Sequence, residues 1–511
     1  MKKILKIIFS RLFYVGMAIV LQVTALVWMM VFLGEKFKVL SFLMTAVALL
    51  MVLWLVNKRI NPSYKLAWTI LILSLPVFGA VIYFVFGESR IAKNMQIQLA
   101  RQAMRTRGLL QENKGVRNHL EEEDLRISNH SRYIRDYAGF PVCEGTTAEY
   151  FPIGEELFAS LVEELHKAEH FIFMEYFIID QGEMWNTVLK ILEEKAKQGV
   201  DVRLVYDDMG CVNTLPPQFY KSLQKRGIKC AAFNPFRPIM SVILNNRDHR
   251  KITVIDGHTG FTGGINLADE YINRKKRFGH WKDTGVRLRG EAVASFTVMF
   301  IEMWNVITRM EDDAAAYMPH VWHPEPFEGD GFCQPYGDTP LDEEVVGENV
   351  YLNMISLAKR YLYIFTPYLI IDNEMMTALC LAAKNGVDVR IVTPGIPDKK
   401  MVFLLTQSYY EQLLDAGVRI YEYVPGFLHA KSFVCDDETA VVGTINMDYR
   451  SLYLHFECGV WMYRTKAVMQ VKEDVIKTMA KSREITKEFC LGRPLPVRTL
   501  QSILRLFAPL L

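Results

Sequence analysis

Hydrophobic side chains are concentrated at the start of the chain, in three stretches at residues 12–33, 39–56 and 66–86. Each stretch has about 20 residues, the length that an α-helix needs to cross the hydrocarbon core of a bilayer. A cleavable signal peptide would instead have an apolar stretch of about 7–15 residues, followed by a small-residue cleavage site. The pattern therefore predicts a membrane anchor that stays attached to the chain.

Charged residues beside these stretches predict how the anchor is oriented. Basic residues precede the first stretch and separate the second from the third, which favours the cytoplasmic side for both regions and gives two crossings. Residues 90–117 carry seven Lys or Arg and one acidic residue, so this segment is also expected inside, against anionic lipid or as a solvated helix face. Pro76 and Gly79 permit a re-entrant third segment that returns to the cytoplasmic face, with a full third crossing as the alternative.

The rest of the chain contains an internal repeat, in which helix-like segments alternate with apolar strand-like segments. The repeated pairs are residues 170–180 and 360–372, 199–206 and 386–393, 227–233 and 417–423, and 246–264 and 426–443. Alternating strands and helices indicate βαβ units and mixed, mostly parallel sheets. We therefore predict an α/β fold of two similar lobes, with sheets flanked by helices, related by a pseudo-twofold axis that brings equivalent positions together.

The boundaries of these parts follow from shifts in composition. We expect a transmembrane anchor at residues 1–88, a basic juxtamembrane connector at 89–138, a first lobe at 139–322, a linker at 323–347, a second lobe at 348–492 and an amphipathic tail at 493–511. The predicted linker is rich in Gly, Pro and acidic residues and has no apolar period. The tail gathers apolar residues on one side of a short helix, so it is expected either to lie on the bilayer or to dock on the lobes.

Composition excludes several classes of protein. Half of the 511 residues are hydrophobic, and 59 Lys and Arg balance 57 Asp and Glu, which excludes a disordered chain and a polybasic nucleic-acid binder. A nuclease would need a basic groove free of the bilayer, so no nucleic-acid partner is expected. The eight cysteines are dispersed, with no CxxC pair and no histidine at zinc-ligand spacing. They are predicted to be reduced structural thiols, which suits a cytoplasmic location of the lobes.

The candidate chemistry lies in the last repeated segment, where an HxKx4D motif occurs once in each lobe. The two copies are His249, Lys251 and Asp256, and His429, Lys431 and Asp436. In a strand, side chains two residues apart project from the same face, so the imidazole and the ammonium group can converge on one phosphate oxyanion. One copy arises by chance in roughly a few of every hundred chains of this length, whereas two matched copies make chance remote. The alternative is a pair of histidines with core contacts only.

Other polar residues repeat at matched distances from the two motifs. Asn266 and Asn446 each follow their histidine by 17 residues, and an amide at that place can donate to a phosphate oxygen. A nucleophilic imidazole also needs a carboxylate on its other nitrogen to fix the tautomer, and the candidates are Asp283 and Glu457.

The two aspartates of the motif, Asp256 and Asp436, lie at an odd offset from their histidines. In a strand they would therefore point to the other face, and we expect them to stabilise the hairpin turns. A catalytic role is the alternative.

The motifs resemble those of the phospholipase D superfamily, whose members carry a paired HKD motif. The segments GGINLADEY at residues 263–271 and NMDYRSLYLHFE at 446–457 are similar to those of the bacterial cardiolipin synthase family, as are the apolar N-terminal hairpin and the C-terminal tail. The likeness covers nearly the whole chain. His455 departs from it, because Asn is expected just before Phe456 and Glu457.

The resemblance implies a phosphatidyltransferase that joins two phosphatidylglycerol molecules into cardiolipin and releases glycerol. By analogy His249 is the nucleophile and His429 the acid and base, with the reverse assignment open. Lys251, Lys431 and the two asparagines would hold the phosphate oxygens, so no metal or cofactor is implied.

The same resemblance implies an enzyme of the bacterial plasma membrane that contacts anionic lipid. The alternatives are a phospholipase D that hydrolyses lipid to phosphatidic acid, a synthase that uses another lipid alcohol such as phosphatidylethanolamine, and a lipid-binding scaffold without turnover.

Overall fold

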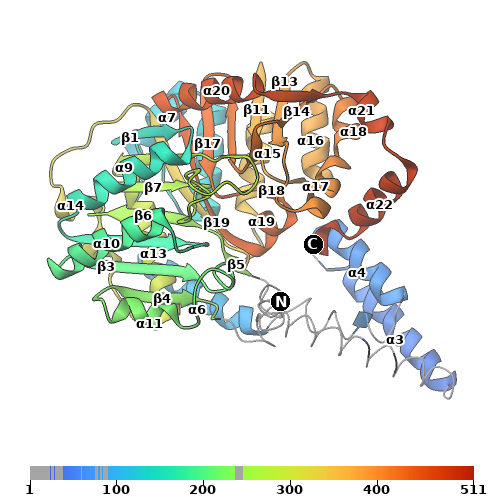
Figure 1. Cartoon of the computed structure of the whole chain (residues 1–511), viewed down its shortest axis with the longest axis horizontal. Helices are drawn as coiled ribbons and strands as arrows, with labels where there is room; N and C mark the ends of the chain where they lie inside the picture. Colours follow the sequence, from blue (N-terminus) through green and yellow to red (C-terminus); the bar gives the residue numbers. More distant parts are fainter. Residues whose placement is uncertain are drawn as a thin grey trace. The chain divides into compact units, whose positions relative to one another are not determined.

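The computed structural model describes residues 24, 28, 38–58, 60–74, 79–80, 83, 90–235 and 246–510 (Figure 1). The described residues divide into two compact units. One contains the N-terminal helices and residues 234–235 and 503–510, and the other contains residues 95–233 and 246–502. The second unit holds both predicted lobes.

The first lobe is built on a seven-stranded mixed sheet. Its strands, in spatial order, are β1 (Thr146–Phe151), β9 (Gly285–Gly290), β7 (Thr259–Gly263), β6 (Lys251–Ile255), β2 (Phe171–Tyr176), β3 (Asp201–Asp207) and β4 (Lys229–Phe233). All six residues of β2 are buried, which explains why the sequence shows a continuous apolar run there.

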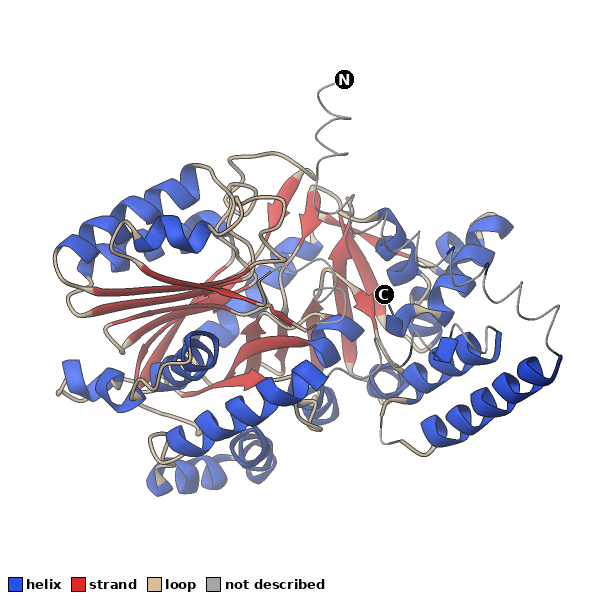
Figure 2. Ribbon diagram, turned by 90° about the horizontal axis from the view of Figure 1, so that it is seen from below, coloured by secondary structure: helices blue, strands red, loops and turns tan. Residues whose placement is uncertain are grey.

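The second lobe repeats this order. Its strands are β10 (Phe332–Asp338), β19 (His455–Tyr463), β17 (Thr439–Gly443), β16 (Ser432–Cys435), β11 (Tyr361–Phe365), β13 (Asp388–Pro394), β14 (Arg419–Tyr423) and β20 (Ser482–Ile485). The strand-by-strand correspondence confirms the two similar lobes that the internal repeat predicts. Figure 2 shows the strands of both lobes with helices on either side.

The expectation of mostly parallel sheets is wrong. Among the described strands of the first sheet, only the pairs β2/β3 and β3/β4 are parallel, and the other four pairs are antiparallel. The reason is that the motif strand and its neighbours are joined by a hairpin and return antiparallel, whereas only the segments joined by helices form parallel pairs.

Amphipathic helices cover the sheets. The helix α9 (Gly154–Lys167) buries Leu157, Leu161 and Leu165, which are four residues apart and therefore lie on one face. Acidic residues occupy its first turn and basic residues its last, as the helix dipole favours. In the second lobe, α20 (Lys466–Met479) covers β11, β16 and β17 with an apolar face of the same kind.

Two predicted connecting segments belong to the folded lobes. The predicted linker, residues 323–347, contains β10, which pairs along its whole length with β19. This segment escaped the sequence pattern because Gln334, Pro335 and Gly337 interrupt the apolar residues of β10, whose place at the edge of the sheet tolerates Pro335. The predicted connector, residues 89–138, ends in α8 (Leu125–Tyr133), whose Ser131 carbonyl accepts a hydrogen bond from Gln334 of β10.

The N-terminal unit contains α3 (Lys38–Val56) and α4 (Pro62–Ser74), which pack through Leu55, Trp68 and Ile72. Among the residues that the structure describes, no helix has both the length and the hydropathy that a membrane span requires. The first predicted stretch, residues 12–33, lies outside the described residues apart from Thr24 and Trp28. The membrane crossings stay a prediction.

The C-terminal tail forms α22 (Leu495–Leu506) and a short 3-10 turn. Its Gln501 is buried and donates a hydrogen bond to the carbonyl of Leu404, which belongs to the second lobe. Leu495 and Ile503 are exposed. The contact of Gln501 supports the docked arrangement for this part of the tail. All eight cysteines are free thiols, as predicted.

Candidate active site

Each motif histidine is held by backbone pairing with the other lobe. The short strand β5 (Arg247–Asp248) precedes His249 and runs parallel to the start of β19, and the His249 amide donates to the Phe456 carbonyl at 2.9 Å. Likewise β15 (Gly426–Leu428) precedes His429 and pairs with β8 (His280–Lys282) of the first lobe, and the His429 amide donates to the Lys282 carbonyl at 2.7 Å. The two motifs therefore meet at the contact between the lobes.

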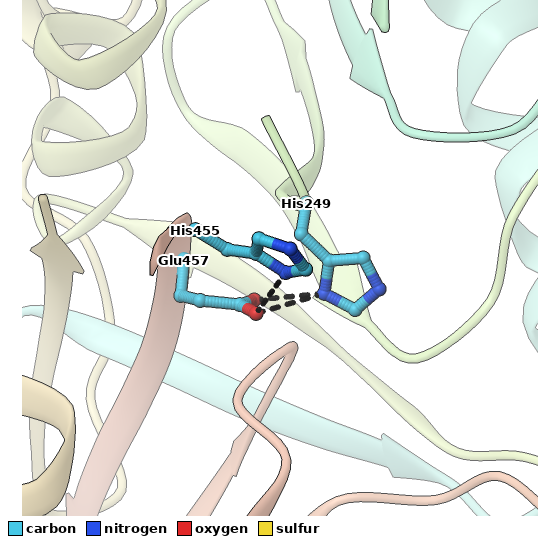
Figure 3. Close-up of side chains that lie close together, drawn as sticks. All are labelled: His249, His455 and Glu457. Carbon is cyan, nitrogen blue, oxygen red and sulfur yellow. Dashed lines mark hydrogen bonds and ion pairs between the residues drawn. The ribbon is translucent and has the colours of Figure 1, made fainter. Parts of the chain in front are cut away.

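The two predicted carboxylates contact the two imidazoles, and each does so across the lobes. Nδ1 of His249 lies 2.9 and 3.0 Å from the carboxylate oxygens of Glu457 (Figure 3). Nδ1 of His429 lies 2.7 Å from the carboxylate of Asp283. A carboxylate at Nδ1 keeps the proton on that nitrogen and leaves the Nε2 lone pair free. Both rings are therefore oriented for chemistry at Nε2.

Hydroxyl groups complete the setting of Glu457. Thr444 and Ser451 each donate to its carboxylate, and the Glu457 side chain has no solvent exposure. No motif in the sequence singles out these two hydroxyl residues. Their only signal is position, since both lie within the segment that joins Asn446 to Glu457 or beside it.

Both imidazoles are neutral near pH 7 in the free protein. Burial lowers the pKa of His249 to about 3, and the nearby charge of Lys251 acts in the same direction. Burial lowers the pKa of His429 to about 4, with Lys431 as the next contribution. A neutral imidazole is the form that can act as a nucleophile or a base.

The motif lysines are buried beside the histidines. The ammonium group of Lys251 donates to the carbonyl of His249 at 2.5 Å, and Lys431 donates to the carbonyl of His429. Burial lowers the pKa of Lys251 to about 8 and that of Lys431 to about 7. The charge of Lys251 also helps to lower the pKa values of Lys431 and His429, which places both motifs in one electrostatic field. Such a site favours an anion.

The two asparagines differ in their contacts. Asn266 accepts a hydrogen bond from the Ile178 amide at 2.9 Å and donates to the Tyr271 hydroxyl at 2.7 Å, which leaves one of its two N–H groups for another acceptor. The side-chain oxygen of Asn446 is buried and has no hydrogen-bond partner among the described residues.

Asp256 and Asp436 lie at hairpin turns and contact backbone. The Asp256 carboxylate accepts hydrogen bonds from the amides of residues 169, 170 and 171 at the start of β2. The Asp436 carboxylate accepts three equivalent bonds from residues 359, 360 and 361 at the start of β11. Both residues also have positive φ angles, 49° and 57°, which Asp tolerates better than most residues. These contacts support the turn-stabilising role of both aspartates, and their grouping with the catalytic residues stays a prediction.

Aromatic rings and a buried ion pair surround the histidines, and no motif in the sequence predicts either. The Phe177 ring lies 5.0 Å from the His249 ring, and Trp281 lies 5.5 Å from His429. Between the two motif residues His249 and Lys251, Arg250 turns to the other face and pairs with buried Glu175 at 2.5 Å. Arg250 lies one residue from His249, so in an extended chain its side chain is expected to point away from the imidazole. This position is the sequence feature that indicates a separate partner for Arg250.

His455, the residue that departs from the expected pattern, is a third imidazole at the site. Its Nδ1 lies 3.8 Å from Glu457, and its ring centre is 5.5 Å from that of His249. His249, His455 and Glu457 form the one group among the described residues whose three potential ligand atoms lie within 4.8 Å of one another.

Two known family models match the chain. A family model described as cardiolipin synthase, PLD-like domain, matches residues 161–304 and 351–479, and a model described as phospholipase D-nuclease N-terminal matches residues 46–88. The chain belongs to the cardiolipin synthase family with PLD-like domains. The two matched segments correspond to the two lobes.

Several relatives match over most of the chain. An uncharacterized protein of Streptococcus mutans is 45% identical over 460 residues, covering 90% of this chain and 99% of its own. A cardiolipin synthase of Geobacillus sp. (strain WCH70) is 36% identical, covering 88% of this chain and 89% of its own. The crystal structure of phosphatidylserine synthase from Haemophilus influenzae has a TM-score of 0.56 at 14% identity, covering 75% of this chain and 100% of its own, which shows a shared fold.

Proposed function

We propose that the protein is a cardiolipin synthase, which transfers a phosphatidyl group from one phosphatidylglycerol to another and gives cardiolipin and glycerol. The observation that carries this proposal is the pair of neutral imidazoles, each oriented by a carboxylate of the other lobe. Relatives that are named cardiolipin synthase and match almost end to end support the choice of substrate.

In the first step, Nε2 of His249 attacks phosphorus and the bond to the glycerol oxygen breaks. His429 gives a proton to that oxygen as it leaves, which yields free glycerol and a phosphatidyl-histidine. The bound phosphodiester is an anion, so it raises the pKa of His429 above its value in the free protein and allows the ring to carry this proton. Splitting the displacement into two steps lowers the barrier of each.

In the second step, His429 takes the proton from a glycerol hydroxyl of the second phosphatidylglycerol. The hydroxyl oxygen attacks phosphorus and the bond to His249 breaks, which regenerates the neutral His249 ring and leaves on His429 the proton that it gives to the leaving glycerol in the next turnover. Lys251 and Lys431 stabilise the charge on the non-bridging oxygens in both steps, because both ammonium groups are buried and held beside the histidines. Asn266 and Asn446 are assigned to the same oxygens.

The enzyme is proposed to act at the bacterial plasma membrane, anchored by its N-terminal apolar stretches, with the lobes on the cytoplasmic side. The apolar stretches and the basic segment that follows them support this placement. The matching strand orders of the two sheets support a pseudo-twofold relation of the lobes. Anionic phospholipid is accordingly both the substrate of the enzyme and a component of the membrane that anchors it.

Incubation of the detergent-solubilised protein with labelled phosphatidylglycerol, without added metal, tests the proposal. The account expects glycerol release with a four-chain product. Phosphatidic acid as the product would identify a hydrolase, and no turnover would identify a scaffold. His249→Ala and His429→Ala are expected to abolish transfer with unchanged folding by circular dichroism, whereas the exposed His320→Ala keeps the wild-type rate.

A further inference from the structure

His455 is a buried imidazole beside the Glu457 carboxylate. It is 9% exposed, and neither of its ring nitrogens has a hydrogen-bond partner among the described residues. Buried polar groups are nearly always satisfied, so an unsatisfied ring beside a functional site calls for a ligand. Figure 3 shows the His455 ring and the His249 ring both beside the Glu457 carboxylate. The group of His249, His455 and Glu457 is named the HHE cluster below.

The distances in the HHE cluster are close to those of a metal site. Nδ1 of His249 and Nδ1 of His455 lie 2.9 and 3.8 Å from the same carboxylate oxygen of Glu457. Ligand atoms on a tetrahedral Zn²⁺ are about 3.3–3.6 Å apart, given metal–ligand bonds of about 2.0–2.2 Å. All three potential ligand atoms lie within 4.8 Å of one another, so the cluster is close to the spacing that a bound ion requires.

The donor set selects the kind of metal. Two imidazole nitrogens and one carboxylate oxygen suit Zn²⁺ and related transition metals, whereas Mg²⁺ and Ca²⁺ require oxygen ligands.

We propose that the HHE cluster binds one Zn²⁺ ion and that this binding silences the phosphatidyltransferase. The second half of this inference rests on the proposed function. The ion displaces the proton from Nδ1 of His249, the atom that now faces Glu457, and the neutral ring then carries its proton on Nε2 instead. Nε2 thereby loses the lone pair that attacks phosphorus. His455 adds the third ligand to the pair formed by His249 and Glu457.

Direct measurement of Zn²⁺ binding tests the first half of the proposal, the metal site itself. The full chain in detergent is stripped with a chelator and titrated with ZnCl₂ by calorimetry, and one ion per chain is expected. The His455→Asn variant removes one ligand and should weaken binding by at least about 10-fold. The control is His320→Asn, which changes an exposed histidine whose ring lies 3.7 Å from Glu291, and it should bind as the wild type does.

Equal Zn²⁺ affinity in the wild type and in His455→Asn would overturn the proposal, as would Mg²⁺ binding at the same affinity. Co²⁺ provides a second measurement on the wild type alone, in case the variant does not fold. Its visible spectrum should be that of a tetrahedral ion with nitrogen and oxygen ligands, and a purely octahedral spectrum contradicts the site.

The activity assay tests the silencing. Transfer by the wild type should fall with a midpoint equal to the Zn²⁺ dissociation constant and should return with a chelator. In His455→Asn, measured against its own metal-free rate, the midpoint should rise at least about 10-fold. Zn²⁺ binding that needs His455 but leaves transfer intact would overturn the silencing. Absence of transfer in every metal-free sample would overturn the proposed function, while the calorimetric result on the metal site would stand.

Discussion

Nδ1 of His249 lies 2.9 Å from the carboxylate of Glu457, although the two residues are 208 positions apart and belong to different lobes. His429 and Asp283 form the reciprocal pair, at 2.7 Å and 146 positions apart. Each lobe thus supplies one imidazole and the carboxylate that orients the other. A single lobe, even when folded, has no oriented histidine.

The reciprocal carboxylates should matter equally. Glu457→Gln and Asp283→Asn keep the shape of each side chain but remove the acceptor charge that fixes the histidine tautomer. Each is expected to lower kcat by roughly 10²- to 10⁴-fold. Initial rates on phosphatidylglycerol check this, with the melting temperature as a folding control. A rate within twofold of the wild type for either variant would show that the carboxylate replaced in that variant is not needed for catalysis.

The motif aspartates should affect stability more than chemistry. Asp256→Asn keeps a residue that tolerates the positive φ angle but weakens three backbone hydrogen bonds, so we expect a loss of about 1–3 kcal/mol. Thermal unfolding should show a lower midpoint. The rate per folded molecule, assayed well below that midpoint, should stay near the wild-type value, and a large loss there would return Asp256 to the catalytic residues.

Anion binding should weaken as the pH rises. Lys431 has a pKa lowered to about 7 by burial, so its positive charge is present below pH 7 and is lost above it. Sulfate does not titrate in this range and serves as the probe. Its inhibition constant against phosphatidylglycerol should rise by roughly 10-fold per pH unit above pH 7 if one protonated lysine is needed. In Lys431→Met the pH dependence should shift upward, towards the pKa of about 8 of Lys251.

An interlobe ion pair supports the histidine-bearing strands. Lys282, next to Asp283, lies 2.6 Å from Asp474 of α20, and both side chains are largely buried. Asp474→Asn leaves a buried ammonium group with less compensation and is expected to cost about 3 kcal/mol. Adding Lys282→Met to Asp474→Asn should recover part of the lost thermal stability. A double variant less stable than Asp474→Asn would contradict this explanation.

Sequence periodicity predicted the parts of the fold that depend on local chain order. The apolar run HFIFMEYFIID contains β2, and the two GVDVR segments begin β3 and β13, because a strand buried on both faces leaves a continuous hydrophobic signal. The edge strand β10 was missed, because Gln334, Pro335 and Gly337 interrupt its apolar residues.

The residues of the site could be predicted from the sequence, but not which carboxylate pairs with which histidine. The equal spacing within the two motifs identified His249, Lys251, His429 and Lys431, and the requirement for a tautomer-fixing carboxylate identified Asp283 and Glu457. Which carboxylate orients which imidazole depends on the docking of β5 on β19 and of β15 on β8. That docking joins residues more than a hundred positions apart, and no local pattern records it.

Trapping the covalent intermediate tests the account most directly. The protein is mixed rapidly with phosphatidylglycerol labelled in its phosphate, quenched in alkali during the first turnover, and mapped by peptide mass. The account predicts label on the peptide that contains His249, rising and then decaying as cardiolipin forms, and absent in His249→Ala. Cardiolipin formation without label on either motif histidine at any time would contradict it.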